Sequence, residues 1–246
     1  MSTEPADEGP PAAGSPLAGL GVGTIVYCLQ THLGTGGLFM AGVGPVNGPR
    51  PFVGRARTLR CVPTRADVAE EQRRSGAPTP HRQAIDGVSP GEVLVIDARG
   101  SRAAAVAGDV LATRVHAAGG AAMVTDGCVR DLPGLARVDL PVYAAGANAT
   151  LFSTHHLGIA VNEPVACGGV LVLPGDLVVG DAEGVVVVPA RLEAEVARLA
   201  RDQEDLDAFS VEQIRRGVPL ARAYPLDAEL RGEFERRRPR AKRPAP

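Results

Sequence analysis

The sequence predicts an α/β fold with a mixed sheet, and three features along the chain support this prediction. Between residues 92 and 126, an apolar strand pattern, a helical pattern and a second strand pattern follow one another. Between residues 140 and 189, short strand patterns are separated by glycine turns. From residue 191 a charged helical pattern begins. A strand–helix–strand unit of this length favours two parallel strands joined by a right-handed crossover.

The first half of the chain contains four clear elements around a polar segment. Residues 92–97 include the run Val-Leu-Val-Ile, which is typical of a strand buried on both faces. In residues 103–119, apolar side chains such as Val106, Val110 and Val115 recur at helical spacing on one face, and Gly119-Gly120 ends the pattern. The expected elements are a strand over 53–62, a polar segment over 63–80, a short helix over 81–87, a strand over 92–97, a helix over 103–119 and a strand over 121–126.

The second half alternates strands with turns and then becomes helical. Pro174-Gly175-Asp176 is a typical turn sequence. The expected elements are strands over 141–144, 170–173, 177–180 and 184–188, an amphipathic helix over 191–209, and a second short helix over 210–216 that Gly217 ends. Residues 17–50 contain many glycines and give no readable pattern.

The composition is that of a globular protein with an acidic body. The 246 residues are 45% hydrophobic and 3% aromatic, which predicts an aliphatic core and no aromatic platform for single-stranded nucleic acid. Residues 231–246 hold seven Lys/Arg and two Glu, a charge of +5, so a net charge of -2 leaves -7 on the rest. We therefore do not expect a nucleic-acid partner, although the basic end could touch RNA or phosphate.

These features define the expected domains and location. We expect a disordered tail over residues 1–16, a single domain over 17–230 and a basic disordered tail over 231–246. The widely spaced Cys28, Cys61, Cys128 and Cys167 predict buried thiols in a reducing compartment. No run of 18 apolar residues and no secretory signal is visible, which favours a cytoplasmic protein without a membrane partner.

The most informative motif is Asp109, twenty intervening residues, and then Arg130-Asp131. A carboxylate can hold a hard divalent cation, and a guanidinium can clamp a substrate carboxylate with paired hydrogen bonds. This combination suits enolate chemistry on a 2-oxo acid. The spacing alone is weak, because it arises by chance about one time in ten in a chain this rich in Arg and Asp.

The surroundings make the motif specific. Characteristic segments lie at residues 53–58, 90–97, 162–170, 174–181 and 184–189. In this order they resemble the RraA-like family, which includes 4-hydroxy-4-methyl-2-oxoglutarate aldolases, over roughly residues 53–225. The resemblance implies an α/β/β sandwich of the swivelling, phosphohistidine-domain-like type with C-terminal helices. It also implies a homotrimer or homohexamer with active sites at the subunit interfaces.

The resemblance assigns the substrate side of the site. The backbone of Gly108, Asp109, Val110 and Leu111 would cradle the pyruvyl carboxylate, and Arg130 would bind the 2-oxo acid and stabilise the enolate oxygen. If a helix begins near Gly108, its free N–H groups independently provide an anion pocket. The alternative is that Asp109 is a solvent-facing helical residue.

The resemblance also assigns the metal side. Asp131 would be the protein's direct ligand to Mg²⁺ or Mn²⁺, with water in most other positions. Asp109 would orient a water on the cation, and Glu204 resembles an acid that reaches a neighbouring subunit's site. The alternative for Arg130 and Asp131 is an exposed ion pair of little energetic worth.

Three further acids have competing interpretations. Asp176 and Asp181 belong to family motifs, but both follow glycine-rich turns, so we interpret them as turn caps. Asp126 either supports the loop that carries Arg130 or simply ends its strand.

The chain departs from its relatives where a second substrate carboxylate would bind. Relatives commonly have Ala-Arg-Gly after the Pro-Val strand, but Ala145 stands here in place of the arginine, and no Lys or Arg occurs between Arg137 and Arg191. A neighbouring subunit could supply the cation. His155 and His156 either lie in a loop near the pocket mouth or contact the distal part of the substrate. A histidine would replace the cation only partly at neutral pH.

We therefore expect a divalent-metal-dependent lyase, of the class II aldolase or 2-oxo acid decarboxylase type. It would cleave a C–C bond of a 2-oxo acid through a metal-bound pyruvate enolate. Two alternatives stay open: a non-catalytic regulator that binds a ribonuclease, and a specialised biosynthetic enzyme with a less anionic substrate.

Overall fold

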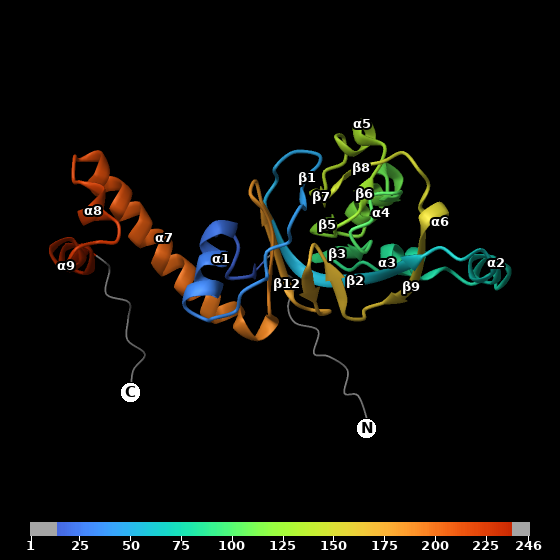
Figure 1. The fold of residues 1–246 in the computed structure, drawn as a ribbon, viewed down its shortest axis with the longest axis horizontal. Helices are drawn as coiled ribbons and strands as arrows, with labels where there is room; N and C mark the ends of the chain where they lie inside the picture. Colours follow the sequence, from blue (N-terminus) through green and yellow to red (C-terminus); the bar gives the residue numbers. More distant parts are fainter. Residues whose placement is uncertain (1–13, 238–246) are drawn as a thin grey trace, which may run out of the picture. The chain divides into compact units, whose positions relative to one another are not determined.

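The structure is a computed structural model that describes residues 14–237, so segments 1–13 and 238–246 lie outside it (Figure 1). Most of the expected tail 1–16, and the end of the expected tail 231–246, fall in these segments. Ser15 at the edge of the first tail donates a hydrogen bond to Glu193 (2.7 Å).

The chain forms two compact units, of which the first ends at Ala197 and the second begins at Arg198. We expected one domain over residues 17–230. The boundary falls inside a continuous helix, α7 (Glu193–Arg215), so no proline- or glycine-rich linker marks it in the sequence.

An eight-stranded mixed sheet forms the centre of the first unit. The strands β7, β5, β3 and β2 run parallel, whereas β1, β9, β12 and β13 pair antiparallel with their neighbours. The predicted mixed sheet, with parallel pairing across the strand–helix–strand unit, is confirmed. The sheet contains β1 (Gly44–Pro45), β7 (Val142–Ala144), β5 (Ala122–Thr125), β3 (Glu92–Asp97), β2 (Phe52–Pro63), β12 (Leu177–Asp181) and β13 (Gly184–Val188) in this order, with β9 (His156–Val161) also paired to β2.

Shorter elements cover or extend this sheet. The strands β4 (Ala105–Ala107), β6 (Cys128–Val129) and β8 (Gly146–Ala147) form a small parallel sheet, and β10 (Val165–Cys167) pairs with β11 (Val170–Val172) as a hairpin. The helices of this unit are α1 (Val22–Thr31), α2 (Ala66–Arg74), α3 (Pro80–Asp86), α4 (Asp109–Ala117), α5 (Leu132–Leu135) and α6 (Phe152–His155), followed by a 3-10 turn at Ala190–Leu192.

The side chains of β3 alternate between two cores. Leu94 and Ile96 are fully buried in the cluster that contains residues of α3 and α4. Val93 and Val95 are fully buried in the cluster that contains the β10–β11 hairpin, β12 and β13. Period-two alternation therefore places a helical layer on one face and a second β layer on the other. This arrangement confirms the α/β/β sandwich.

The sequence interpretation of residues 103–119 as one helix was wrong in its first part. Residues 105–107 form β4, and the helix α4 begins only after Gly108. Val106 is fully buried in the strand, whereas Val110, expected on the same apolar face, is 76% exposed. The helical spacing was a coincidence, because pairing of β4 with β6 satisfies the backbone of residues 105–107 instead.

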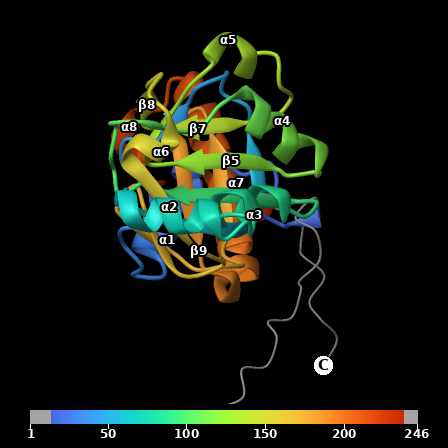
Figure 2. The same ribbon diagram turned by 90° about the vertical axis from the view of Figure 1, so that its right-hand side faces the viewer.

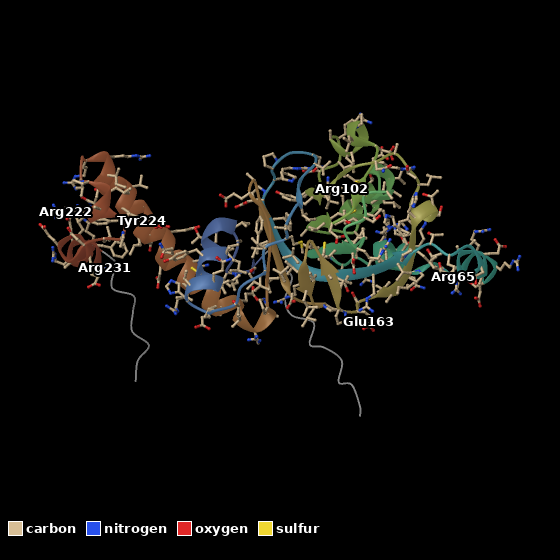
Figure 3. The ribbon with its side chains drawn as sticks, in the orientation of Figure 1. Arg65, Arg102, Glu163, Arg222, Tyr224 and Arg231 are labelled. Carbon is tan, nitrogen blue, oxygen red and sulfur yellow. The ribbon has the colours of Figure 1, made fainter. Side chains whose placement is uncertain are left out.

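The expected polar segment 63–80 contains the helix α2. This helix buries no residue and lies at one end of the first unit, at the right in Figure 1 and toward the viewer in Figure 2. Local ion pairs such as Arg74 with Glu70 (2.7 Å) stabilise it, and Arg65 lies exposed just before it (Figure 3). Because this helix buries no apolar face, no apolar pattern in the sequence indicates it.

The second unit continues α7 and adds α8 (Leu220–Ala223) and α9 (Ala228–Arg237). Its core contains Phe209, Leu226, Leu230 and Phe234. The two helices expected over 191–209 and 210–216 are one continuous helix, within which the Ser210 hydroxyl donates to the Leu206 carbonyl (3.0 Å) and caps no new helix.

The expected disordered tail also begins later than residue 231. Helix α9 extends to Arg237, and its buried residues Leu230 and Phe234 face α7 residues of the same unit. Arg222 forms ion pairs with Asp227 (2.7 Å) and Glu229 (2.8 Å) beside this helix (Figure 3). Apolar contacts within the unit therefore order residues that composition alone assigned to a tail.

The four cysteines are buried free thiols, as predicted. Burial raises the pKa of the Cys61 thiol to about 12 and that of Cys167 well above its ordinary value. Among residues 14–237, no helix has the length and apolar character needed to cross a membrane.

Candidate active site

Two short parallel strands bring the halves of the Asp/Arg-Asp motif together. In the register of β4 and β6, Ala107 is paired with Val129, and the Arg130 N–H donates to the Ala107 carbonyl (3.0 Å). The chain leaves β4 at Gly108 and β6 at Arg130. Both halves therefore begin at the carboxyl ends of neighbouring parallel strands, where α/β sheets commonly hold ligands.

The first half is the amino end of helix α4. Gly108 is the N-cap, so the helix begins at the glycine on which the anion-pocket interpretation depends, and not at residue 103 as expected. The Val110 N–H donates a hydrogen bond to the Asp109 carboxylate (2.8 Å). The Leu111 N–H has no hydrogen-bond partner within residues 14–237. This end of the helix therefore offers a free donor and a partial positive charge.

The second half is the strained turn at Asp131. Its backbone is left-handed (φ 57°, ψ 43°), a conformation that costs a non-glycine residue about 1–3 kcal/mol. Its carbonyl accepts from the N–H groups of Gly134 (2.8 Å) and Leu135 (2.9 Å), which holds the turn. A β-carbon on Gly108 would overlap Asp131 Oδ2, and Arg130 Nε lies 3.2 Å from the same oxygen.

Each acid of the motif packs against a glycine in the other half of the motif. Asp131 lies against Gly108 of the first half, and Asp109 lies against Gly134 of the second, where a β-carbon would overlap Asp109 Oδ2. The Thr113 hydroxyl also donates to the Asp109 carbonyl (2.8 Å). Close approach at two glycines thus fixes α4 against the start of α5.

A cavity of about 140 Å³ opens at this junction. Its charged lining residues are Arg130 and Asp131, and His81 is its other titratable residue. The remaining lining residues are apolar: Ala105, Val106, Ala107, Gly108, Val110, Leu111, Leu151 and Phe152. The cavity therefore joins the predicted carboxylate-binding and metal-binding residues to an apolar wall.

His81 and Phe152 line the cavity, although sequence reasoning missed both. Because a carbonyl only accepts, His81 Nε2 must carry the proton that it shares with the Val106 carbonyl (2.9 Å). The His81 ring also stacks on Phe152, with centroids 4.0 Å apart and planes 12° apart. Burial lowers the pKa of His81, and the bond to Val106 only partly opposes this. The imidazole is therefore neutral near neutral pH.

Other predicted residues lie elsewhere. The Asp109 carboxylate is not part of the cavity lining, so its role on water stays a prediction. Glu204 lies on α7 in the second unit, and its role toward a neighbouring subunit also stays a prediction. His155 is exposed and His156 is 1% exposed, and neither lines this cavity. Ala145 lines a separate cavity of about 590 Å³.

Three acids bind backbone groups. The Asp126 carboxylate accepts from the N–H groups of Ala98 (2.7 Å) and Gly100 (2.8 Å), so it ties the end of β5 to the loop after β3. Asp176 accepts from the Leu173 N–H (2.9 Å), and Asp181 accepts from the N–H of Val22 (2.9 Å) and of Glu183 (2.8 Å). The interpretation of Asp176 and Asp181 as structural caps is confirmed, whereas the hydrogen bonds of Asp126 go to the loop after β3 and not to the loop that carries Arg130.

The side chains around the cavity fit a hard cation better than zinc. Asp131 is the one carboxylate among the lining residues, and no group of three or more His, Cys, Asp or Glu side chains within residues 14–237 is arranged to hold an ion. Zinc sites need three or four such ligands. Mg²⁺ keeps several waters and binds through one or two carboxylates, which this donor set allows.

Comparison with known proteins gives the same family from sequence and structure. The RraA-like profile, described as Aldolase/RraA, matches residues 23–187. A Halalkalibacterium halodurans protein named "Putative 4-hydroxy-4-methyl-2-oxoglutarate aldolase" is 34% identical over 183 residues, which are 74% of this chain and 80% of that protein.

Two solved structures share the fold. An uncharacterized protein from Pseudomonas syringae pv. tomato superposes with a TM-score of 0.72 and 27% identity, covering 85% of this chain and 94% of the other. A Streptomyces coelicolor protein, described as an unusual member of the RNase ES inhibitor RraA protein family, has a TM-score of 0.69 and 33% identity over 79% and 93% of the two chains. With both its sequence and its fold matched, this chain belongs to the RraA-like family.

Proposed function

We propose that this protein is a divalent-metal-dependent lyase that releases pyruvate from a 2-oxo acid by retro-aldol cleavage or decarboxylation. The observation that carries the proposal is that Arg130, Asp131 and the amino end of α4 border one cavity. The aldolase name of the Halalkalibacterium halodurans relative supports a lyase in general terms.

The chain's own residues would bind the pyruvyl end. The amino end of α4 attracts an anion, and the Leu111 N–H is a free donor there. Arg130 uses Nε toward Asp131, which leaves its terminal nitrogens for the substrate. The carboxylate and the 2-oxo oxygen of the substrate would therefore lie between α4 and Arg130.

Cleavage leaves an electron pair on the pyruvyl carbon, and negative charge spreads onto the 2-oxo oxygen. Arg130 would stabilise this charge where it develops. A divalent cation held by Asp131 would supply Lewis-acid polarisation of the 2-oxo group. Asp109, at the first turn of α4, would orient the water that returns a proton to the pyruvyl carbon. Glu204 of a neighbouring copy would complete the site, which we expect to require a trimer or hexamer.

The test is pyruvate release from three substrates with different leaving groups: oxaloacetate, 4-hydroxy-4-methyl-2-oxoglutarate and 4-hydroxy-2-oxopentanoate. Each is assayed with Mg²⁺ or Mn²⁺, with chelator, and with Asp131→Ala. Asp67→Ala is the matched control, because Asp67 lies on α2, which buries no residue. The rate without enzyme is subtracted, since oxaloacetate decarboxylates unaided.

We expect release that chelator and Asp131→Ala abolish and that Asp67→Ala retains. Full activity of Asp131→Ala would sink the assignment. A folded, metal-loaded protein that releases no pyruvate but captures a ribonuclease in stoichiometric amount would favour the regulator instead, a function suggested by the description of the Streptomyces coelicolor structure.

A further inference from the structure

The cavity has a charged end and an apolar end, and strand β4 connects them. At one end of β4, the Ala107 carbonyl accepts from the Arg130 N–H (3.0 Å). At the other end, the Ala105 N–H donates to the Thr150 carbonyl (3.0 Å), immediately before Leu151 and Phe152. Two residues of extended strand span about 7 Å. The cavity wall therefore leads from Arg130 toward the side chains that begin α6.

The end of the cavity near α6 is lined by apolar side chains and carries no charge. Leu151, Phe152 and Val106 line it, and the His81 ring lies flat on Phe152. His81 contributes no charge, because its Nε2–H is committed to the Val106 carbonyl and burial disfavours a second proton. An apolar group placed here would lose water and gain contacts on several sides.

A second substrate carboxylate finds no partner in this cavity. Among its lining residues within 14–237, Arg130 is the one cationic side chain, and it is already 3.2 Å from Asp131. Removing an unpaired carboxylate from water is costly. The sequence also contains no Lys or Arg between Arg137 and Arg191, the stretch that includes Leu151 and Phe152.

We propose that the leaving fragment of the substrate is uncharged and apolar, with an aryl or branched alkyl group packed against Leu151 and Phe152. This inference rests on the proposed lyase function and names its substrate class. The substrate is then a 4-hydroxy-2-oxo acid with an apolar group on C4. Arg130 holds the carboxylate end in the same orientation whatever the group on C4.

The reaction balances without an oxidant or reductant. The C3–C4 bond breaks, and its electron pair passes into the pyruvate enolate. The hydroxyl on C4 loses its proton as the C4 carbonyl forms, and C3 takes up one proton. The products are pyruvate and an aldehyde or ketone that carries the apolar group.

The first experiment compares two matched substrates by pyruvate release. One is 4-hydroxy-2-oxo-4-phenylbutanoate, which yields benzaldehyde, and the other is 4-hydroxy-2-oxoglutarate, which yields glyoxylate. We expect kcat/KM to be at least about tenfold higher for the phenyl compound, the smallest discrimination that a well-filled apolar pocket usually gives. Equal rates, or faster cleavage of the dicarboxylate, would overturn the inference.

The second experiment measures binding without cleavage. The dissociation constants of 2-oxo-4-phenylbutanoate and 2-oxoglutarate are determined by calorimetry in the presence of Mg²⁺, because neither has a C4 hydroxyl to start the reaction. We expect tighter binding of the phenyl compound by at least about tenfold. Tighter binding of 2-oxoglutarate would contradict the proposal whatever the activity.

A variant that introduces a positive charge tests where the leaving group binds. Leu151 is 55% exposed, so Leu151→Arg can place a guanidinium at the apolar end without burying it. It should shift the preference toward the dicarboxylate by at least about tenfold, as a charged hydrogen bond would. Leu171→Arg is the matched control, because Leu171 is 61% exposed on β11 and does not line the cavity. An unchanged preference in Leu151→Arg would place the leaving group elsewhere.

The two proposals fail in distinguishable ways. If pyruvate is released and the dicarboxylate is preferred, the lyase stands and the apolar leaving group is wrong. If no pyruvate is released but the phenyl compound binds more tightly, the ligand class stands and the lyase is wrong. If neither 2-oxo acid binds, both are wrong.

Discussion

The carboxylate of Asp131 lies directly against the α-carbon of Gly108, where the chain passes from β4 into α4. A β-carbon on Gly108 would overlap Asp131 Oδ2 and would come within 3.2 Å of Arg130 Cγ. The backbone of Gly108 itself is extended, so its conformation does not require glycine. The absence of a side chain is what lets the proposed metal ligand approach the helix.

Gly108→Ala should therefore displace Asp131 and lower pyruvate release by about 100-fold, the scale of loss that a 1 Å misplacement produces. The helix should tolerate the alanine, so circular dichroism should be unchanged. Gly44→Ala is the control, because a β-carbon there meets no atom within 4 Å. Wild-type activity in Gly108→Ala would show that Asp131 does not need this position.

Arg130→Lys should raise KM and lower kcat/KM by about 10- to 100-fold, because a lysine cannot form the paired hydrogen bonds of a guanidinium. Initial rates over a range of substrate concentration separate the two parameters. Arg137→Lys, at an exposed position outside the cavity, should behave as wild type. An unchanged KM in Arg130→Lys would remove Arg130 from substrate binding.

Stability should fall as pH drops below about 6.5, the ordinary histidine value. Burial lowers the pKa of His156 in the folded protein, the Ala104 carbonyl and Asp126 oppose this shift, and Arg99 and His155 add to it. As the pH falls below about 6.5, His156 takes up a proton in the unfolded chain before it does so in the folded protein. The contribution of neutral, buried His156 to stability is therefore present above about pH 6.5 and is lost on acidification.

Urea unfolding from pH 5.5 to 7.5 measures this dependence. His156→Asn should flatten it relative to wild type, whereas His155→Asn, at the exposed neighbour that contributes only a lesser part of the shift, should change it far less. Burial raises the pKa of Asp97 and of Asp176, which gives stability a pH dependence of the opposite sign. Both residues are present in wild type and in the variants, so their contribution cancels in the comparison. Equal slopes in wild type and His156→Asn would contradict the prediction.

Leu94→Ala should destabilise the protein by about 2–5 kcal/mol, because it opens a cavity between β3 and the helical layer. Leu94 is fully buried, whereas Leu171→Ala, at 61% exposure, should change stability little. The difference in urea midpoint between the two variants measures the effect. Similar midpoints would mean that the core relaxes around the missing side chain.

The sequence predicted strands best where apolar residues are continuous. Residues 92–97 and 184–188 were expected as strands and form β3 and β13 with the same bounds. Such runs are buried on both faces, so burial alone specifies them. Residues 105–107 were misread because a three-residue strand is too short to reveal its period beside a helix.

Two of the predicted site residues next to strand ends border one cavity, whereas the far wall of that cavity was not predicted from the sequence. Arg130 and Asp131 carry their chemistry in their residue types, and both line the cavity. His81 and Phe152 come from α3 and α6, and only tertiary packing stacks them. Their individual sequence contexts contain nothing that points to a shared cavity.

The crossover between β4 and β6 also explains what the twenty-residue interval of the motif represents. Helix α4, a turn, strand β5 and the short strand β6 occupy that interval, and each half of the motif is positioned by its own strand end. The interval is thus the length of chain needed for one helix and two strands, and it does not measure the distance between reacting groups. Relatives with a longer or shorter helix there could keep the same chemistry at a different spacing, and a search restricted to this number would miss them.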